Sequence, residues 1–192
     1  MALRVLALYF VLFAALHSLL ADMRAKSLAG RIFGPAADRR YRPVYVAISF
    51  LTLVPVVYLL ASAPQRVLYR VSAPWSWLMM ALQALSALAL IGALMQTGLM
   101  DFLGIKPRMG PGKLIKSGFY CHLRNPLFLF GMTFIWLTPF MTDMLLVLYS
   151  LITIYFYVGA LHEERSLLAE FGAEYAEYRR RVPMFIPLLR CR

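Results

Sequence analysis

The sequence contains few acidic residues for its length. Asp and Glu together number 9 against 20 Lys and Arg, which gives a formal net charge of +11. Such a charge could indicate a nucleic-acid partner, but the basic residues lie in short segments between long apolar runs. This distribution is typical of loops that contact anionic lipid headgroups and set membrane topology. The charge pattern therefore favours membrane lipids as a partner and argues against nucleic acid.

Cysteine is equally scarce. Cys121 and Cys191 are the only two, and two cysteines so far apart show no metal-ligand spacing and say nothing about the redox compartment. The terminal pair Cys191-Arg192 is not a prenylation box. The sequence also lacks a convincing internal repeat and a low-complexity tract, and its 192 residues suit a single domain. No metal is expected from this pattern.

Apolar residues, by contrast, are abundant. They make up 61% of the chain and the mean hydropathy is +0.69, whereas soluble domains are about 45–50% apolar. A helix of about 20 residues crosses the hydrocarbon core of a bilayer. The sequence thus predicts an all-α integral membrane protein with about five spans, the last two forming a hairpin with Pro139 at its turn, followed by an amphipathic cytoplasmic helix over 166–181. The predicted spans are 2–21, 44–63, 74–100, 126–141 and 143–161.

The basic residues also predict an orientation. Seventeen of the 20 Lys and Arg fall in the first loop, the third loop and the C-terminal tail, and three fall on the other side. Under the positive-inside rule, the N-terminus lies outside and the C-terminus in the cytoplasm of a bacterial-type inner membrane. An alternative reading makes 1–21 a cleaved signal peptide, but six basic residues follow it closely and oppose its translocation. Within one domain, 1–101 would hold three spans and 102–192 a ligand-binding loop, the hairpin and a cap.

A glycine-rich basic segment, 110–120, leads into Arg124-Asn125-Pro126. Glycines allow close approach of a backbone to a ligand. Pro126 suits the first turn of a helix, whose free N–H groups attract an anion, and Arg124 would bind a carboxylate in bidentate fashion. The segment therefore predicts an anion pocket at the cytoplasmic surface. A solvated basic loop that contacts lipid phosphates is the alternative.

Two further groups are candidates for function. Glu163 and Glu164 lie where the last span meets the cytoplasm, and adjacent carboxylates there are costly unless they are paired or hydrated. They would bind a cationic ligand or pair with Arg124, or simply mark an ordinary interfacial helix. His17 lies inside the first span, where an ionisable side chain is either functional or hydrogen-bonded to a neighbouring helix. Gln83 and Gln96 indicate interhelical hydrogen bonds rather than ligands.

The order of these motifs resembles the isoprenylcysteine carboxyl methyltransferase and phospholipid methyltransferase superfamily. The likeness covers roughly the last 80 residues, and segments 16–21 and 136–142 extend it to the methanethiol S-methyltransferase and NnrU-like branch. Two positions depart from the pattern: Asn125 stands where His is commoner, and Phe128 lacks the hydroxyl of the usual Tyr. The matching motifs are Gly118-Phe119-Tyr120, Arg124-Asn125-Pro126-Leu127-Phe128, Glu163-Glu164, Phe171-Gly172-x-Glu174-Tyr175-x-x-Tyr178 and Val182-Pro183.

The resemblance implies a cytoplasmic S-adenosylmethionine pocket under the C-terminal segment, with an acceptor that arrives from the membrane. Glu163 or Glu164 would hold the methionine amino group, and Arg124 would pair with a carboxylate or an anionic acceptor. His17 would assist deprotonation of a thiol if its helix packs nearby. The residues expected to line the cofactor are Leu114, Ile115, Gly118, Tyr120, Asn125 and Pro126.

The predicted function is methylation of a small thiol. Prenylcysteine carboxylate and a phospholipid amine are alternative acceptors within the same class. From other classes, an NADPH-dependent reductase and a non-catalytic NnrU-like membrane factor remain. The acceptor and the oligomeric state are not set by the sequence.

Overall fold

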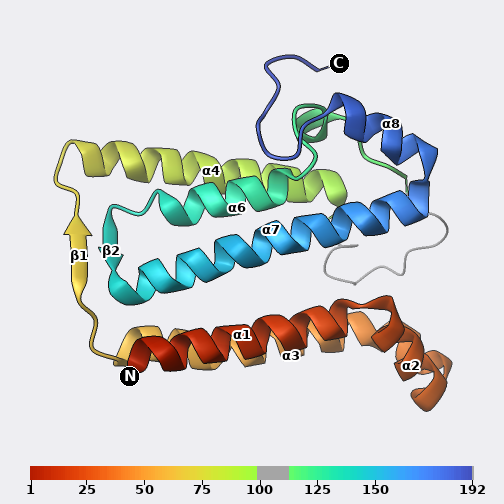
Figure 1. Cartoon of the computed structure of the whole chain (residues 1–192), viewed down its shortest axis with the longest axis horizontal. Helices are drawn as coiled ribbons and strands as arrows, with labels where there is room; N and C mark the ends of the chain where they lie inside the picture. Colours follow the sequence, from red (N-terminus) through yellow and green to blue (C-terminus); the bar gives the residue numbers. More distant parts are fainter. Residues whose placement is uncertain (99–112, 192) are drawn as a thin grey trace. The chain divides into compact units, whose positions relative to one another are not determined.

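A computed structural model describes residues 1–98 and 113–191 (Figure 1). Their contacts divide them into two compact units. The first consists of 1–68 with 142–151, and the second of the described parts of 69–98, 113–141 and 152–191. The division into 1–101 and 102–192 stays a prediction. Within the second unit, the third predicted span packs against C-terminal elements.

Among the described residues, the first unit contains α1 (Ala2–Ala21), α2 (Met23–Phe33), α3 (Pro35–Ser62) and the beginning of α7 (Asp143–Phe171). α1 and α2 both pack against α3. The sequence placed a loop at 23–33, and the helix there is a correction; helix-forming Met, Ala, Lys and Leu residues fill its first turns. Pro35 lies in the first turn of α3, where a missing N–H is tolerated, so the basic segment joins the second span without a break.

Polar side chains of α1 and α3 bond to each other within the apolar helices of this unit. The Nδ1 atom of His17 lies 2.9 Å from the Ser49 hydroxyl, and its Nε2 atom lies 2.6 Å from the Tyr45 hydroxyl. The Tyr41 hydroxyl donates to the Leu20 carbonyl at 2.8 Å. Polar groups in apolar surroundings need such partners, so His17 has a structural role that joins two helices.

The second unit contains α4 (Trp75–Thr97), the short 3-10 helix η1 (Gly118–Cys121), α6 (Pro126–Trp136), most of α7 (Asp143–Phe171) and α8 (Ala173–Arg181). α4 packs along α6. Gln83 donates to the Phe134 carbonyl at 2.9 Å and Ser86 donates to the Phe130 carbonyl at 2.9 Å, so these two polar side chains of α4 bond to the backbone of α6. The interhelical interpretation of Gln83 is thereby confirmed.

A short ribbon joins the helices at the end opposite to α8. β1 (Val67–Arg70) pairs with β2 (Phe140–Thr142), and the Val71 N–H donates to the Pro139 carbonyl at 2.9 Å (Figure 1). α7 begins immediately after β2, where the Thr142 hydroxyl accepts the Leu145 N–H at 3.1 Å as a helix cap. The ribbon was not predicted, because a three-residue strand has too few residues to show an alternating pattern.

Two predicted boundaries were wrong. α6 ends at Trp136 rather than Met141, because Pro139 has no N–H to donate and Phe140–Thr142 instead pair with β1. The helix predicted over 166–181 is two helices: α7 continues to Phe171, and Gly172, at φ +52°, separates it from α8. The helical hairpin is therefore asymmetric, with an 11-residue arm and a 29-residue arm.

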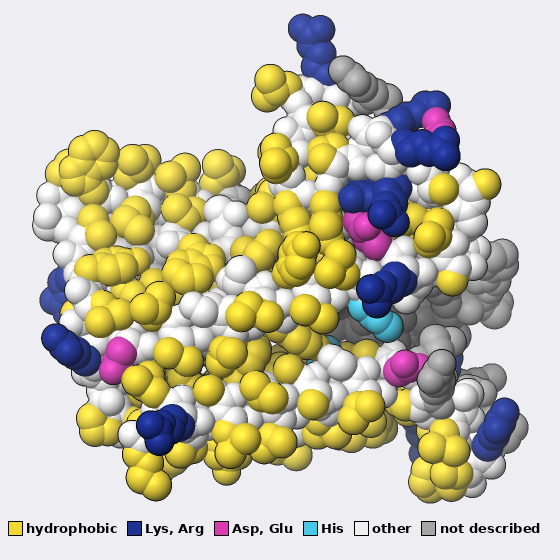
Figure 2. All heavy atoms as spheres, viewed as in Figure 1, with side chains coloured by type: hydrophobic (Ala, Val, Ile, Leu, Met, Phe, Trp, Pro, Cys, Tyr) yellow, Lys and Arg dark blue, Asp and Glu magenta, His cyan; other side chains and the backbone are white. Residues whose placement is uncertain are grey.

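The helices are those of a membrane protein. Four have the length and composition to cross a bilayer, namely Ala2–Ala21, Pro43–Ser62, Trp75–Thr97 and Asp143–Phe171, and α6 is an apolar helix too short for that test. At most 17% of any of these apolar stretches is buried inside the structure, so their side chains face outward, as Figure 2 shows for one face. The all-α membrane class is thereby confirmed: among the described residues, four helices are long enough to span a bilayer, and α6 is a shorter apolar helix.

Candidate functional site

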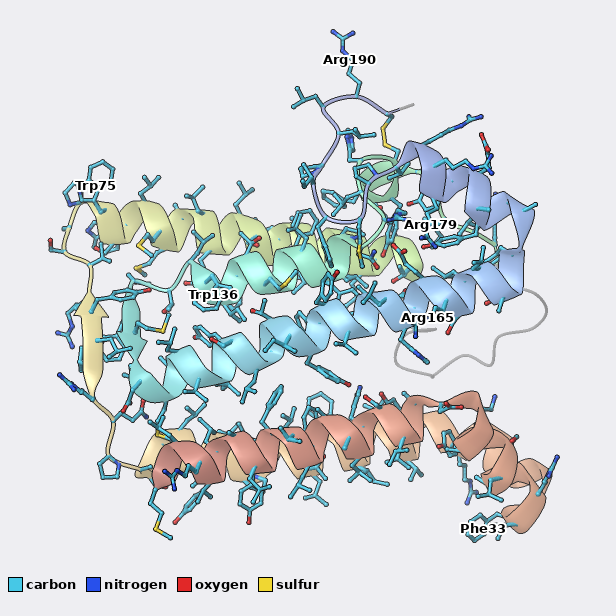
Figure 3. All side chains as sticks on the ribbon, viewed as in Figure 1. Phe33, Trp75, Trp136, Arg165, Arg179 and Arg190 are labelled. Carbon is cyan, nitrogen blue, oxygen red and sulfur yellow. A yellow bond between two sulfur atoms is a disulfide. The ribbon has the colours of Figure 1, made fainter. Side chains whose placement is uncertain are left out.

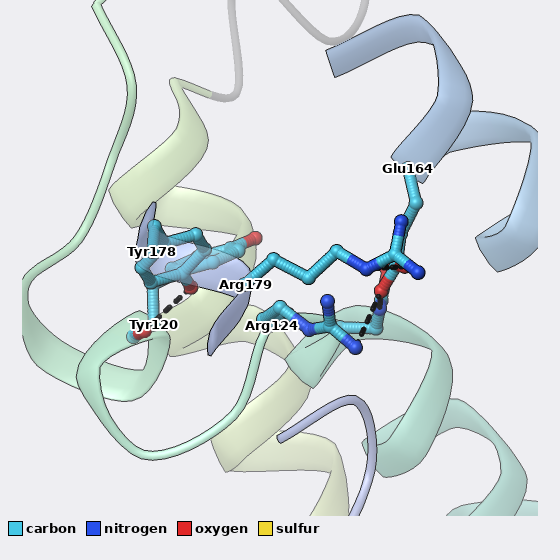
Figure 4. Close-up of polar contacts among 6 residues, drawn as sticks. Tyr120, Arg124, Glu164, Tyr178 and Arg179 are labelled. Carbon is cyan, nitrogen blue, oxygen red and sulfur yellow. Dashed lines mark hydrogen bonds and ion pairs between the residues drawn. The ribbon is translucent and has the colours of Figure 1, made fainter. Parts of the chain in front are cut away.

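Glu164 of α7 is the centre of a buried polar cluster in the second unit (Figure 4). Its Oε1 atom accepts from Arg124 Nη2 at 3.1 Å and from Asn125 Nδ2 at 3.3 Å. Its Oε2 atom lies 3.9 Å from Nε of Arg179, which comes from α8. Residues 39 positions apart thus meet through one carboxylate. Such a buried carboxylate needs these partners, because an isolated buried charge is strongly unfavourable.

The Arg124 side chain is only partly used by this cluster. It is 10% exposed, and its Nε and Nη1 atoms have no hydrogen-bond partner among the described residues. Buried N–H donors without a partner carry a desolvation penalty of about 1–3 kcal/mol each, more for charged groups. A ligand carboxylate would accept from one of these two groups, and the second hydrogen of Nη2 would complete a bidentate pair. The cluster therefore fits the carboxylate of an amino-acid ligand.

The C-terminal tail fixes the backbone that carries Arg124. The Arg124 N–H donates to the Pro183 carbonyl at 2.9 Å, and the Asn125 N–H donates to the Met184 carbonyl at 3.3 Å. Pro126 then opens α6, so Asn125 occupies the cap position, yet its side chain bonds Glu164 rather than the helix. The tail thus holds the arginine and the asparagine in place while leaving their side chains free to bind Glu164.

α8 lies over the segment 114–121. Leu114 forms a buried cluster with Tyr175, Tyr178 and Val182, and the Tyr178 hydroxyl donates to the Tyr120 carbonyl at 2.6 Å. The repeated tyrosines at three-residue spacing place both rings on the same face of the helix. Burial raises the pKa of Tyr175 to about 12 and raises the pKa of Tyr178 as well. Both hydroxyls are therefore protonated donors at neutral pH.

The loop also depends on a glycine next to α4. Gly118 adopts φ +63°, a conformation that side chains with a Cβ rarely take. A Cβ there would lie 2.6 Å from Cδ of Gln96, and the Gln96 carbonyl oxygen accepts the Phe119 N–H at 3.1 Å. Gln96 thus joins α4 to the backbone of η1, which agrees with the interhelical hydrogen bond predicted for it from the sequence.

Glu163 differs from Glu164 in both exposure and partners. It is exposed, and its side chain makes no hydrogen bond or ion pair with any described residue. Its carboxylate is nevertheless close enough to Tyr120 to act on that phenol: burial raises the pKa of Tyr120, and the negative charge of Glu163 raises it further. An acidic group is therefore available beside the loop.

The structure brings together several predicted site residues. Arg124, Asn125 and Glu164 meet directly, whereas Glu163 stands beside Tyr120. Leu114 is buried under α8, and Ile115, Gly118 and Tyr120 lie on the same segment, which Pro126 follows at the start of α6. His17 belongs to the other unit, so its catalytic role stays a prediction.

Sequence reasoning missed some contributors. The contact of Arg179 with Glu164 was not predicted, and neither were the bonds from the tail 183–188 to the arginine segment. Phe128, which lacks the usual hydroxyl, packs its ring 5.4 Å from that of Phe156, between α6 and α7. The repeated tyrosine spacing was the available signal for the cover, whereas nothing local in the sequence indicates the tail pairing.

Replacement of Tyr178 with Phe should weaken the cover. The change leaves the Tyr120 carbonyl without its donor, which costs about 1–2 kcal/mol in the free energy of unfolding. Thermal unfolding in detergent would measure this loss. Tyr157→Phe, at a half-exposed phenol, is the matched control and should leave the midpoint unchanged; equal midpoints for both variants would contradict the role of the bond.

The chain is similar in sequence to several proteins named methanethiol S-methyltransferase. The chain is 31% identical to methanethiol S-methyltransferase 2 of Bradyrhizobium diazoefficiens over 93% of its own length and 70% of that protein. It is 42% identical to the methanethiol S-methyltransferase of Crocosphaera subtropica over 41% of the chain and 31% of that protein. It is 28% identical to the methanethiol S-methyltransferase of Pseudomonas deceptionensis over 99% of the chain and 74% of that protein.

No family model matches the chain, and no solved structure matches it. The fold and the site define a helical membrane protein with a buried guanidinium–carboxylate cluster at one end of its second unit. The likeness over nearly the whole chain identifies it further: the chain belongs to the methanethiol S-methyltransferase family.

Proposed function

We propose that the chain is an S-adenosylmethionine-dependent membrane methyltransferase that methylates a small thiol. The observation that carries the proposal is the buried Arg124 guanidinium, which is anchored through one nitrogen while two others have no partner among the described residues. The names of the relatives supply the reaction and the thiol. The segment 114–121, against which α8 packs, would line the cofactor.

Glu163 and Glu164 would have different roles in binding the zwitterionic end of the cofactor. Glu164 is already bonded to Arg124 and Asn125, so it orients the guanidinium that would receive the ligand carboxylate. Glu163 is exposed and unpaired within the described structure, so it would receive the amino group. Leu114, Ile115, Gly118 and Tyr120 would line the rest of the cofactor.

For methyl transfer, the protein mainly has to position the methyl donor and the thiol. S-adenosylmethionine, when bound, supplies the sulfonium methyl group. A thiol attacks as its thiolate, along the line of the bond that breaks, so the chain must align the two reactants and exclude water. Arg124 would hold one end of the cofactor. Tyr175 and Tyr178 bury Leu114 of the segment 114–121, whereas 116–118 stay exposed. His17 assists deprotonation only if its helix reaches the acceptor.

A lipid-like acceptor is the second candidate, favoured by one observation. An apolar groove of about 420 Å³ lies between α6 and α7, lined by Leu129, Met132, Thr133, Trp136, Leu137 and Thr153. Asn125 precedes the first residue of α6, and Glu164 lies in the C-terminal half of α7. An acyl or prenyl chain in the groove would therefore lie along the two helices that lead to the polar cluster.

Measurements of cofactor binding and of methyl transfer distinguish the proposed function from its alternatives. Detergent-purified protein should bind S-adenosylmethionine in calorimetry and should transfer a labelled methyl group to methanethiol. Transfer to a prenylcysteine or to phosphatidylethanolamine in its place would establish the lipid-like acceptor. Tight NADPH binding would instead indicate a reductase, and binding of neither cofactor would indicate a non-catalytic membrane factor.

We also propose that the N-terminus lies outside and that the polar cluster faces the cytoplasm of an inner membrane. The support is the asymmetry of Lys and Arg, 17 of 20 on one side. Reporter fusions at residue 192 and at the short loop near residue 65 should report opposite compartments. An external C-terminus would overturn the orientation.

Replacement of Glu163 with Gln should weaken cofactor binding selectively. Loss of one ion pair with the amino group should raise the Kd for S-adenosylmethionine about tenfold, which corresponds to about 1.4 kcal/mol. Stability should change little, because the side chain is exposed. Glu177→Gln, which removes an exposed pairing within α8, is the control and should leave the Kd unchanged. A wild-type Kd for Glu163→Gln would exclude this residue as the amino-group partner.

A further inference from the structure

A second group of reactive side chains lies where the C-terminal tail meets η1. Cys121 ends η1, His122 follows it, and Cys191 comes from the tail. One ligand atom from each of the three lies within 4.8 Å of the others. In the structure the two sulfurs are joined as a disulfide across 70 residues of sequence (Figure 3). None of the three residues belongs to the guanidinium–carboxylate cluster.

The imidazole of His122 is arranged as a metal ligand. Its Nδ1 atom lies 2.6 Å from the Leu188 carbonyl oxygen. A carbonyl can only accept, so Nδ1 carries the proton and Nε2 has a lone pair. Nε2 faces Cys191, with 3.5 Å between the nitrogen and Sγ. Histidines that bind metals usually donate their other N–H to a carbonyl or carboxylate in this way.

The backbone also holds the two segments together without the cysteines. The Leu188 N–H donates to the His122 carbonyl at 2.9 Å, and the tail continues to pair with Arg124 and Asn125 through Pro183 and Met184. Three donors from segments that are far apart in sequence are therefore held near one point by bonds that do not depend on a sulfur–sulfur link. This is the preformed geometry that a metal site needs.

We propose that Cys121, His122 and Cys191 form a binding site for one thiophilic divalent cation, Zn²⁺ above all, when both thiols are reduced. A thiol reductant converts the disulfide into two thiols and is itself oxidised to a disulfide. The cation then replaces two thiol protons, which are released, and accepts the Nε2 lone pair. Two sulfurs and one nitrogen leave the fourth position of a tetrahedral zinc open to water or to an exogenous thiol.

A cation bound at this site would hold the C-terminal tail against η1. Under the proposed orientation it faces the cytoplasm, where thiols are kept reduced, so the cation would replace the disulfide as the link between Cys191 and η1. That link would reinforce the hydrogen bonds that position the Arg124 backbone. Cation binding therefore couples the C-terminal tail to the candidate functional site.

Cobalt spectroscopy tests the site on the intact protein. Full-length protein in detergent, reduced and stripped of metal, is titrated with Co²⁺. We expect thiolate-to-cobalt charge-transfer and tetrahedral visible bands that saturate at one equivalent and disappear when Zn²⁺ is added. Cys191→Ser and His122→Gln should each weaken binding at least tenfold, whereas His162→Gln, at an exposed histidine, should bind as the wild type does.

Three outcomes would overturn the site: no thiolate bands although both thiols react with a thiol reagent, bands that are unchanged in Cys191→Ser, or a disulfide that persists in excess reductant. Retained binding of S-adenosylmethionine or a wild-type unfolding midpoint would show that a variant without bands is still folded. Failure of the metal site would leave the proposed methyl transfer intact, because that activity is measured separately.

Discussion

Arg124→Met should abolish methyl transfer and destabilise the protein more than any other single change in the cluster. The substitution removes the guanidinium that is proposed to hold the cofactor carboxylate, so kcat/KM should fall at least about 100-fold, which corresponds to about 2.7 kcal/mol. It also leaves Glu164, 7% exposed, without its main partner. Removal of one partner from a buried pair costs about 3–5 kcal/mol.

The lower end of that range is expected, because Arg179 remains 3.9 Å from the other oxygen of Glu164. The measurements are labelled-methyl transfer and thermal unfolding in detergent. Arg181→Met is the matched control: Arg181 is 62% exposed and pairs with Glu177 within α8, so its loss should cost at most about 0.5 kcal/mol. Activity within threefold of wild type in Arg124→Met would refute the proposed role.

A double variant separates stability from function. Arg124→Met combined with Glu164→Leu replaces the whole buried pair with apolar side chains, which is often neutral for stability. The unfolding midpoint should therefore recover most of the loss, whereas methyl transfer should not recover. Recovery of both would mean that Arg124 acts only by neutralising Glu164.

Features that depend on local sequence could be predicted, whereas features that depend on contacts between distant residues could not. Long apolar runs predicted α1 and α4 within a few residues, because a bilayer demands a stretch of about 20 apolar residues whatever its neighbours are. The same runs located α3 and α7, but α3 begins at Pro35 rather than 44 and α7 ends at Phe171 rather than 161. α6 was predicted five residues too long, since only the partner strand β1 shows that 140–142 leave the helix. The break at Gly172 was visible as a glycine, but a continuous amphipathic spacing hid it.

In the candidate site, too, a contact between side chains of opposite charge could be predicted, whereas backbone contacts between distant segments could not. The pairing of Arg124 with Glu164 was one of the stated alternatives, because opposite charges at the ends of adjacent helices have few other partners. The bonds from the tail to Arg124 and Asn125 were not foreseen, since backbone pairing leaves no trace in side-chain type. The meeting of Cys121 with Cys191 escaped notice for a related reason: 70 residues separate them, and ligand spacing is readable only within one local segment.

Gly118→Ala should have the second-largest effect, although it adds a single methyl group. A φ of +63° costs a residue with a Cβ about 1–2 kcal/mol. The new Cβ would also displace the Gln96 side chain, and with it the bond from the Phe119 N–H, for about 1 kcal/mol more. The total loss of about 2–3 kcal/mol should lower the unfolding midpoint. Because the segment is proposed to line the cofactor, the Kd for S-adenosylmethionine should rise more than tenfold.

Gly172→Ala is a close control for the backbone term. Gly172 also has a positive φ, +52° with ψ −122°, but a Cβ there would meet nothing within 4 Å. Its substitution should therefore show a conformational cost alone, about 1–3 kcal/mol, with the cofactor Kd unchanged. Adding Gln96→Ala to Gly118→Ala removes the steric conflict, although the hydrogen bond to the Phe119 N–H stays lost, so the double variant should be more stable than Gly118→Ala alone. A double variant no more stable than Gly118→Ala would show that Gln96 does not constrain the loop.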